Sequence, residues 1–236
     1  MIVENKSFDE ERALYGLKGL TVKNCRAALW YDKDIYIENS KLFGIKAIRE
    51  CENISLKNCS VNSPEFAWKS QNLKIENVTI EKSEYPFFEI RGAKITGLKM
   101  KGKYSFQYDE NIEIADSELD TKDAFWHTKN VTVKDSLVKS EYLGWYSENL
   151  TLINCRIKGT QPFCYCKNLL LKNCIMEDCD LAFERSGVFA EVNGKIDSVK
   201  NPLKGKITAD EIGELILEDD FCDKTKTKIV CRNMNN

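Results

Sequence analysis

Short segments of alternating apolar and polar residues recur along most of this sequence. In the segment Leu150–Ile153, for example, Leu150 and Leu152 are apolar and Thr151 is polar. Such alternation is typical of a β-strand that buries one face. Cognate segments follow one another at intervals of 19 or 20 residues through the central part of the chain. They begin at Leu20, Ile35, Ile54, Leu73, Ala93, Ile112, Val131, Leu150, Leu169 and Ala190.

Asparagine or aspartate residues mark two turns in most repeats. These residue types tolerate left-handed backbone geometry, and side chains stacked from one repeat to the next can hydrogen-bond to one another. We therefore expect an asparagine ladder at each turn. The first column contains Asn24, Asn39, Asn58, Asn77, Asp116, Asp135, Asn154 and Asn173, and the second contains Asn53, Asn72, Asn111, Asn130, Asn149 and Asn168.

Each repeat also contains a second strand-like segment and a third, aromatic-rich segment. In the repeat that begins at Ile112, Leu119 marks the second segment and Phe125–His127 forms the third. Three short strands in about 19 residues leave no room for a helix, which disfavours a leucine-rich repeat. The pattern predicts an all-β fold, a single-stranded right-handed parallel β-helix in which equivalent residues stack about 4.8 Å apart. We expect about ten to eleven coils of about 19 residues each.

The repeat also sets the expected boundaries of the fold. Residues 1–19 fall outside the repeat and include the charged run Asp9–Arg12, which suits an N-terminal cap over the first coil. Residues 20–218 hold the coils, and residues 219–236 are polar enough to form a C-terminal cap or tail. The sequence therefore predicts a single β-helix domain over residues 1–236.

Several motifs of the chain resemble those of a known family. They are Arg26–Tyr31, Phe125–His127, Leu181–Ser186, Ser198–Pro202 and Ala209–Glu214. On these motifs the chain resembles an uncharacterised bacterial family, a domain of unknown function with a pectin-lyase-like right-handed parallel β-helix. The resemblance spans nearly the whole chain. It implies the fold and supplies no activity.

The charge balance and the absence of certain segments exclude several partners. Lys plus Arg number 35 and Asp plus Glu number 37, so no strong basic field attracts nucleic acid or an anionic membrane. The first residues lack the pattern of a secretory signal, and no apolar run is long enough to cross a bilayer. We therefore expect a cytoplasmic protein whose ten cysteines are reduced thiols.

The aromatic segment is the main candidate for a functional surface. Its expected outward column, counted at a fixed offset from each strand start, contains Lys69, Phe88, Tyr108, His127, Tyr146, Tyr165 and Glu184. Residues two positions earlier are expected to face outward too, whereas Trp68, Phe87, Trp126, Trp145 and Phe183 are expected to point into the core. The predicted ligand-binding residues are Tyr108, Phe125, Tyr146, Phe163 and Tyr165.

Five ionisable residues are candidates for catalysis. His127 is the only histidine, and histidine is the residue type most often used in general acid–base chemistry. Glu184 and Arg185 are adjacent, and Arg185 suits a bidentate clamp on a carboxylate or phosphate. Glu89 and Asp109 occupy equivalent places in neighbouring repeats, as a glycosidase carboxylate pair does. Solvated or salt-bridged surface groups explain the same residues, so the sequence leaves open whether the protein is an enzyme.

The cysteine pattern favours core packing over metal binding. Cys155 and Cys174 share a column in which serine occupies other repeats, as expected of small core residues. Cys164, Cys166 and Cys179 lie nearby without the paired spacing of a zinc site. Glycine-rich phosphate loops, nucleophile elbows and metalloprotease histidine pairs are missing too. We therefore predict no metal and no cofactor.

Two classes of function remain. Sugar rings stack on aromatic faces, so the first class is a protein that binds, or processes, a carbohydrate or sugar-derived ligand on the aromatic face. The alternative is a noncatalytic structural or homo-oligomerising cytoplasmic β-helix, in which the same rings form a stabilising ladder or a subunit interface. Neither class involves nucleic acid or a membrane.

Overall fold

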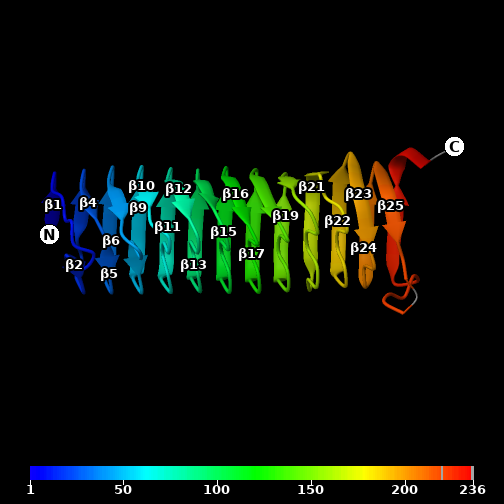
Figure 1. Cartoon of the computed structure of the whole chain (residues 1–236), viewed down its shortest axis with the longest axis horizontal. Coiled ribbons are helices and arrows are strands. Elements are labelled where there is room, and N and C mark those ends of the chain that lie inside the picture. The colour runs from blue at the N-terminus through cyan, green and yellow to red at the C-terminus, as the bar shows by residue number, and fades with distance from the viewer. Residues whose placement is uncertain (219, 235–236) are drawn as a thin grey trace. The chain divides into compact units, whose positions relative to one another are not determined.

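The computed structural model describes residues 1–218 and 220–234 of the chain. Residues 219, 235 and 236, which belong to the expected C-terminal segment, lie outside the described residues. The chain comprises two compact units, Met1–Asp120 (unit 1) and Thr121–Asn236 (unit 2). Each unit is built from short β-strands that pair in parallel with strands of neighbouring coils, and Figure 1 labels most of them.

Unit 1 holds strands β1 to β15, and β16 (Glu118–Lys122) crosses the division between the units. The strands are β1 (Ile2–Glu4), β2 (Leu14–Tyr15), β3 (Thr21–Lys23), β4 (Arg26–Ala27), β5 (Leu29–Trp30), β6 (Lys33–Glu38), β7 (Lys41–Phe43), β8 (Ile48–Arg49), β9 (Glu52–Lys57), β10 (Ser60–Asn62), β11 (Gln71–Glu76), β12 (Thr79–Ser83), β13 (Arg91–Thr96), β14 (Lys99–Gly102) and β15 (Glu110–Ala115).

Unit 2 holds the remaining strands and one short 3-10 helix. They are β17 (Lys129–Lys134), β18 (Leu137–Glu141), β19 (Glu148–Ile153), β20 (Arg156–Lys158), β21 (Leu169–Glu177), β22 (Gly187–Asn193), β23 (Lys195–Lys200), β24 (Lys204–Ala209), β25 (Glu211–Ile216), β26 (Thr227–Cys231) and η1 (Arg232–Met234). Within the described residues, no helix is long or apolar enough to cross a membrane.

The first strand of each coil buries its apolar face because equivalent residues stack in register. In unit 1, Leu73 of β11 lies between Ile54 of β9 and Ala93 of β13, and all three are buried. In unit 2, Val131 of β17 lies beside Leu150 of β19, and both side chains are fully buried. The residues between these buried positions point to solvent. This register builds a continuous apolar core inside each unit.

Residues in the left-handed backbone conformation, with positive φ, turn the chain between these strands. Asn154 has a φ of 53°, and its side-chain amide donates a hydrogen bond of 2.8 Å to Oδ1 of Asp135. Asn173 donates to Asn154 in turn, also at 2.8 Å. In unit 1, Gly97 interrupts the same column at a φ of 67°, and an added Cβ would lie only 2.5 Å from Oδ1 of Asn77. Glycine is required there because both the backbone and the neighbouring amide exclude a side chain.

The fold is an all-β parallel β-solenoid of about 12 turns of about 19 residues, which confirms the predicted fold class. The number of turns slightly exceeds the ten to eleven expected. Strand β1, within residues 1–19, pairs in parallel with β3. Strand β26, within residues 219–236, pairs in parallel with β24.

Candidate functional site

Unit 2 carries three aromatic rings stacked on its surface, those of His127, Tyr146 and Tyr165, which we call the ring column. The rings of His127 and Tyr146 have centroids 4.9 Å apart and planes 5° from parallel. The rings of Tyr146 and Tyr165 lie 4.8 Å apart at 10°. Parallel rings in contact are separated by about 3.5–4 Å between planes, so these rings are slipped sideways. Part of each face therefore stays uncovered, and Tyr146 is 45% exposed.

The backbone determines which residue follows Tyr165 in the ring column. Along the column, each N–H donates to the carbonyl of the residue that precedes the next member. The N–H of Tyr165 donates to the carbonyl of Glu184 at 2.7 Å, so the next member is Arg185. Counting from the strand starts had placed Glu184 in this position, and that prediction is wrong by one residue.

The side chains of Glu184 and Arg185 have different surroundings. Glu184 is partly buried and forms an ion pair of 3.2 Å with Lys200. Arg185 is exposed, and its guanidinium carbon lies 5.2 Å from the ring centroid of Phe221. Among the described residues, no carboxylate pairs with Arg185. The ring column is thus followed by an exposed cation.

Two tryptophans form a second column beside the rings. The indoles of Trp126 and Trp145 lie 5.5 Å apart and 4° from parallel, and both residues are half-buried. The indole N–H of Trp126 donates to the carbonyl of Tyr142, and that of Trp145 donates to the carbonyl of Gln161, each at 2.8 Å. The prediction that these indoles point into the core is wrong. They lie at the surface and tie each turn to the following coil.

The phenylalanines predicted to face outward are in the core. Phe125 and Phe163 are fully buried, so neither belongs to a surface binding site. The ring of Phe163 stacks instead on that of Phe183, with centroids 6.0 Å apart. Period-two alternation fails here because Phe125 and His127 both have positive φ, 59° and 54°. In this left-handed turn, residues two positions apart face different ways, unlike residues of a strand.

A one-residue bulge displaces the corresponding segment of unit 1. Val61 pairs with Ile80, but Asn62 pairs with Lys82, so β12 accommodates Glu81 as an extra residue. Every position counted after Glu81 is therefore shifted by one. Phe87, which was expected in the core, is indeed fully buried.

Because of this shift, Glu89 and not Phe88 occupies the surface position equivalent to Lys69 in the next coil of unit 1. The N–H of Lys69 donates to the carbonyl of Phe88 at 2.9 Å, which places Glu89 next to Lys69, and their side chains form an ion pair of 3.5 Å. Tyr108 is 47% exposed in the same unit. Its ring meets the ring of Phe88 edge-on, with centroids 5.7 Å apart.

Glu89 and Asp109 do not form the predicted carboxylate pair. Strand pairing sets Arg91 beside Glu110, so Asp109 is level with Ile90 and not with Glu89. Asp109 is fully buried, and burial raises the pKa of its carboxyl group well above the ordinary value. Glu89 is a surface residue engaged with Lys69. The two carboxylates therefore do not face a common solvent-accessible space.

The cysteines fill the core. All ten are free thiols, and nine of them are buried. Most of their sulfhydryls donate to backbone carbonyls, as Cys166 does to Gly144 at 3.0 Å. Burial raises the pKa of Cys166 to about 11 and that of Cys164 to about 12. Among the described residues, no group of three or more His, Cys, Asp or Glu side chains is arranged to hold a metal ion.

Fold and surface together define a parallel β-solenoid with an external aromatic ladder. The family model described as "Protein of unknown function (DUF3737)" matches residues 20–230. The chain belongs to this family, which confirms the resemblance drawn from its motifs. No curated protein sequence matches the chain.

Several solved structures show distant likeness. The catalytic domain of a GH87 alpha-1,3-glucanase in complex with nigerose is 11% identical with a TM-score of 0.41, covering 98% of this chain and 63% of that domain. The Gp54 tailspike of Acinetobacter baumannii bacteriophage AP22, in complex with a capsular saccharide, is 10% identical with a TM-score of 0.32, covering 97% and 48%. The fluoroquinolone resistance protein QnrB1 is 11% identical with a TM-score of 0.29, covering 75% and 92%.

Proposed function

We propose that the protein binds a carbohydrate or sugar-derived ligand on the ring column of unit 2 and does not process it. The observation that supports this proposal is the slipped stacking of His127, Tyr146 and Tyr165 at the surface. Slipped rings expose parts of their faces to the C–H groups of a sugar ring, while the tyrosine hydroxyls and the imidazole offer hydrogen bonds to sugar hydroxyls.

The surroundings of the three predicted catalytic acids favour ligand binding over hydrolysis. A glycosidase needs two carboxyl groups about 5–10 Å apart across the scissile bond. In unit 2, Glu184 is engaged by Lys200 at 3.2 Å. In unit 1, Glu89 is engaged by Lys69, and Asp109 is buried. None of these three predicted acids is presented to a ligand on the ring column.

The proposal includes a cytoplasmic location. The ten cysteines form no disulfide, which suits a reducing compartment. A ligand in that compartment would be a soluble sugar, a sugar phosphate or a nucleotide sugar, and the exposed guanidinium of Arg185, next after Tyr165 along the stack, suits a phosphate.

A structural role for the rings is the alternative, and one observation favours it. Tyr165 and Tyr146 both meet the indole of Trp145 edge-on, with centroids 5.7 and 6.3 Å apart. The contact between Trp145 and Tyr165 joins neighbouring coils and stabilises them without any ligand. A homo-oligomer that covers the ring column would use the same rings.

Binding of a panel of sugars, sugar phosphates and nucleotide sugars to the wild type and to Tyr146→Ala separates these functions. Calorimetric binding that is lost in Tyr146→Ala and kept in Tyr15→Ala supports the proposal, because Tyr15 is an exposed tyrosine of unit 1 outside the ring column. Absence of binding, combined with a dimer that Tyr146→Ala dissociates, would instead identify an oligomer interface. A lower melting temperature with no change in binding or association would identify a structural ladder.

A further inference from the structure

Two apolar side chains lie next to each other on the outer surface of unit 2, and we call them the apolar patch. Strand pairing sets Leu170 of β21 beside Phe189 of β22, and these residues are 42% and 60% exposed. The same outward column is polar on both sides of the patch. Its polar members are Thr132 and Thr151 before the patch and Lys206 and Lys228 after it.

Two opposite charges flank the apolar patch. Leu171 of β21 pairs with Ala190 of β22. Lys172 and Glu191 are the next residues of these strands, and both are exposed. Among the described residues, neither Lys172 nor Glu191 forms an ion pair. A shallow hollow of about 400 Å³ adjoins the patch, and its lining includes Leu170, Lys172, Phe189, Glu191 and Lys206.

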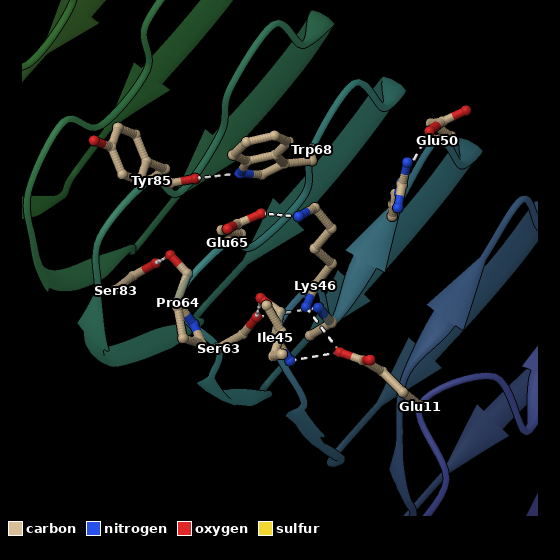
Figure 2. A network of polar contacts seen from close by, with 12 residues as sticks. Glu11, Ile45, Lys46, Glu50, Ser63, Pro64, Glu65, Trp68, Ser83 and Tyr85 are labelled. Atoms are coloured by element: carbon tan, nitrogen blue, oxygen red, sulfur yellow. Dashed lines mark hydrogen bonds and ion pairs between the residues drawn. The ribbon is translucent and has the colours of Figure 1, made fainter.

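Many other charged side chains of the protein do pair from coil to coil. Nζ of Lys57 lies 3.2 Å from Oε1 of Glu76. Figure 2 shows the same kind of pair in unit 1, between the ammonium group of Lys46 and the carboxylate of Glu65. A surface that covers the apolar patch must satisfy Lys172 and Glu191 in this way, because a charge removed from water without an opposite charge is costly. The surface that fits is therefore apolar and carries one charge of each sign.

The outer surface of unit 2 itself meets this requirement in one two-fold arrangement. A two-fold axis that runs parallel to the strands, between β21 and β22, reverses the order of the coils and keeps the direction of the strands. Each residue of β21 then faces its register neighbour on β22 of the other copy. Leu170 therefore faces Phe189, and Lys172 faces Glu191, each of them twice in the dimer.

The next coils out also match in this arrangement, because β19 then faces β24. Glu148, at the start of β19, faces Lys204, at the start of β24. Thr151 faces Lys206. On β19, β21, β22 and β24, all of which the structure describes, no like charges face each other.

The other two-fold arrangement is unfavourable. An axis along the direction in which the coils stack keeps the order of the coils and reverses the strands. Lys167 and Lys172 lie on opposite sides of Leu170 in the sequence, so each would face the other across such an axis. Like charges that face each other are destabilising. The charges thus select the arrangement with reversed coils.

We propose that a second copy of the chain covers the apolar patch, in a two-fold dimer with reversed coil order. Phe189 of each copy packs on Leu170 of the other. Lys172 and Glu191 of both copies form a cluster in which each cation lies between two carboxylates. The ring column lies on a different segment of the coils, so failure of either proposal leaves the other standing.

The size of this surface sets the expected strength of the dimer. Strands about 4.8 Å apart, with a rise of about 3.3 Å per residue, give the six strands β17, β19, β21, β22, β24 and β26 an outer face of about 600 Å². Stable interfaces bury about 800 Å² per partner. We therefore expect a dimer that dissociates at micromolar concentrations.

Sedimentation equilibrium of the full chain over about 1–100 µM tests the proposal. We expect the mass to rise from that of one chain to that of two. Phe189→Thr should weaken the dimer about tenfold or more, because it removes an apolar contact. Threonine already occupies this column at Thr151, so the strand keeps its residue type. Leu137→Thr is the matched control, since Leu137 is 39% exposed on β18, outside the proposed interface. A wild type that stays monomeric, or equal weakening by Leu137→Thr, overturns the proposal.

Exchange of the two charges tests the arrangement. K172E and E191K should each dissociate the dimer, because like charges then face each other. An equimolar mixture of the two variants should dimerise again, because each facing pair at these positions then joins opposite charges. Misfolded variants would not recover on mixing. A mixture that stays monomeric overturns the proposal, and so does tighter association of K172E, which the other two-fold arrangement predicts. Tyr146→Ala should leave the dimer intact, and its dissociation would place the interface on the ring column instead.

Discussion

The backbone N–H of Ile90 donates a hydrogen bond of 2.9 Å to Oδ1 of Asp109, one coil further along the chain. The second carboxyl oxygen, Oδ2, is buried and has no hydrogen-bond partner among the described residues. Two coils before Ile90, the N–H of Cys51 donates in the same way to the hydroxyl of Ser70 in the next coil, at 3.2 Å. Asp109 therefore accepts the hydrogen bond that Ser70 accepts in its own coil, and it adds a buried carboxyl oxygen without a partner in the described part of the chain.

Replacing Asp109 with serine should stabilise the protein, and more so at high pH. Burial raises the pKa of Asp109 in the folded state above its ordinary value, so the protonated form is favoured by folding. Stability from this carboxyl is fully present below its unfolded pKa and is lost as pH rises through its folded pKa. We expect Asp109→Ser to raise the free energy of unfolding by about 1–3 kcal/mol at pH 8 and by less at pH 4.

Guanidinium unfolding at several pH values measures this effect. Glu118→Gln provides the control, because Glu118 is an exposed carboxylate of unit 1 at the first position of β16. A gain in Asp109→Ser that is the same at every pH would show that packing, and not ionisation, causes it.

The indole N–H of Trp145 should contribute to stability through its bond to the carbonyl of Gln161. Trp145→Phe keeps an aromatic ring and removes the donor, so the carbonyl loses its strongest partner. We expect a loss of about 1 kcal/mol in the free energy of unfolding, read as a lower denaturation midpoint with an unchanged slope. Tyr146→Phe keeps the ring stacked on His127 and should leave the midpoint unchanged. A neutral Trp145→Phe would argue against the indole as a tie between coils.

The two hydrogen bonds and the left-handed backbone of Asn154 should contribute separately to stability. Asn154→Ala removes both bonds in the column and leaves a Cβ residue at a φ of 53°. Asn154→Gly removes the same bonds, but glycine adopts that φ without strain. We expect Ala to be less stable than Gly by about 1 kcal/mol, and both to be less stable than the wild type. Equal stabilities of Ala and Gly in denaturant unfolding would show that the backbone is not strained.

The strands and turns of each unit were predictable because local rules govern them. Alternation around Leu150 gave the buried face, and that face depends only on a period of two residues. The left-handed turn at Asn154 followed from residue type, since asparagine tolerates a positive φ. These features repeat in most coils, so the same rules hold for most of the chain.

The same rule could not predict which side chains of the aromatic segment point to the core and which to the surface. Phe125 and His127 both adopt positive φ, so the strand rule assigned Phe125 to the wrong side. The extra residue Glu81 shifts all later positions of its coil by one. Counting at a fixed offset therefore assigned Phe88, and not Glu89, to the surface column. One signal was present in the sequence: tryptophan recurs at the same place in successive repeats, as Trp126 and Trp145 do, and half-buried indoles need a hydrogen-bond partner.

The buried thiols should react slowly in the native protein. Burial raises the pKa of Cys51 and Cys179 to about 12, and the thiolate is the reactive form. Cys231 on β26 is the one cysteine that is only partly buried. We expect an aromatic disulfide reagent at pH 8 to label Cys231 first, and all ten thiols only after denaturation. Cys231→Ser should abolish the fast reaction, and rapid labelling of several thiols in that variant would contradict a closed core.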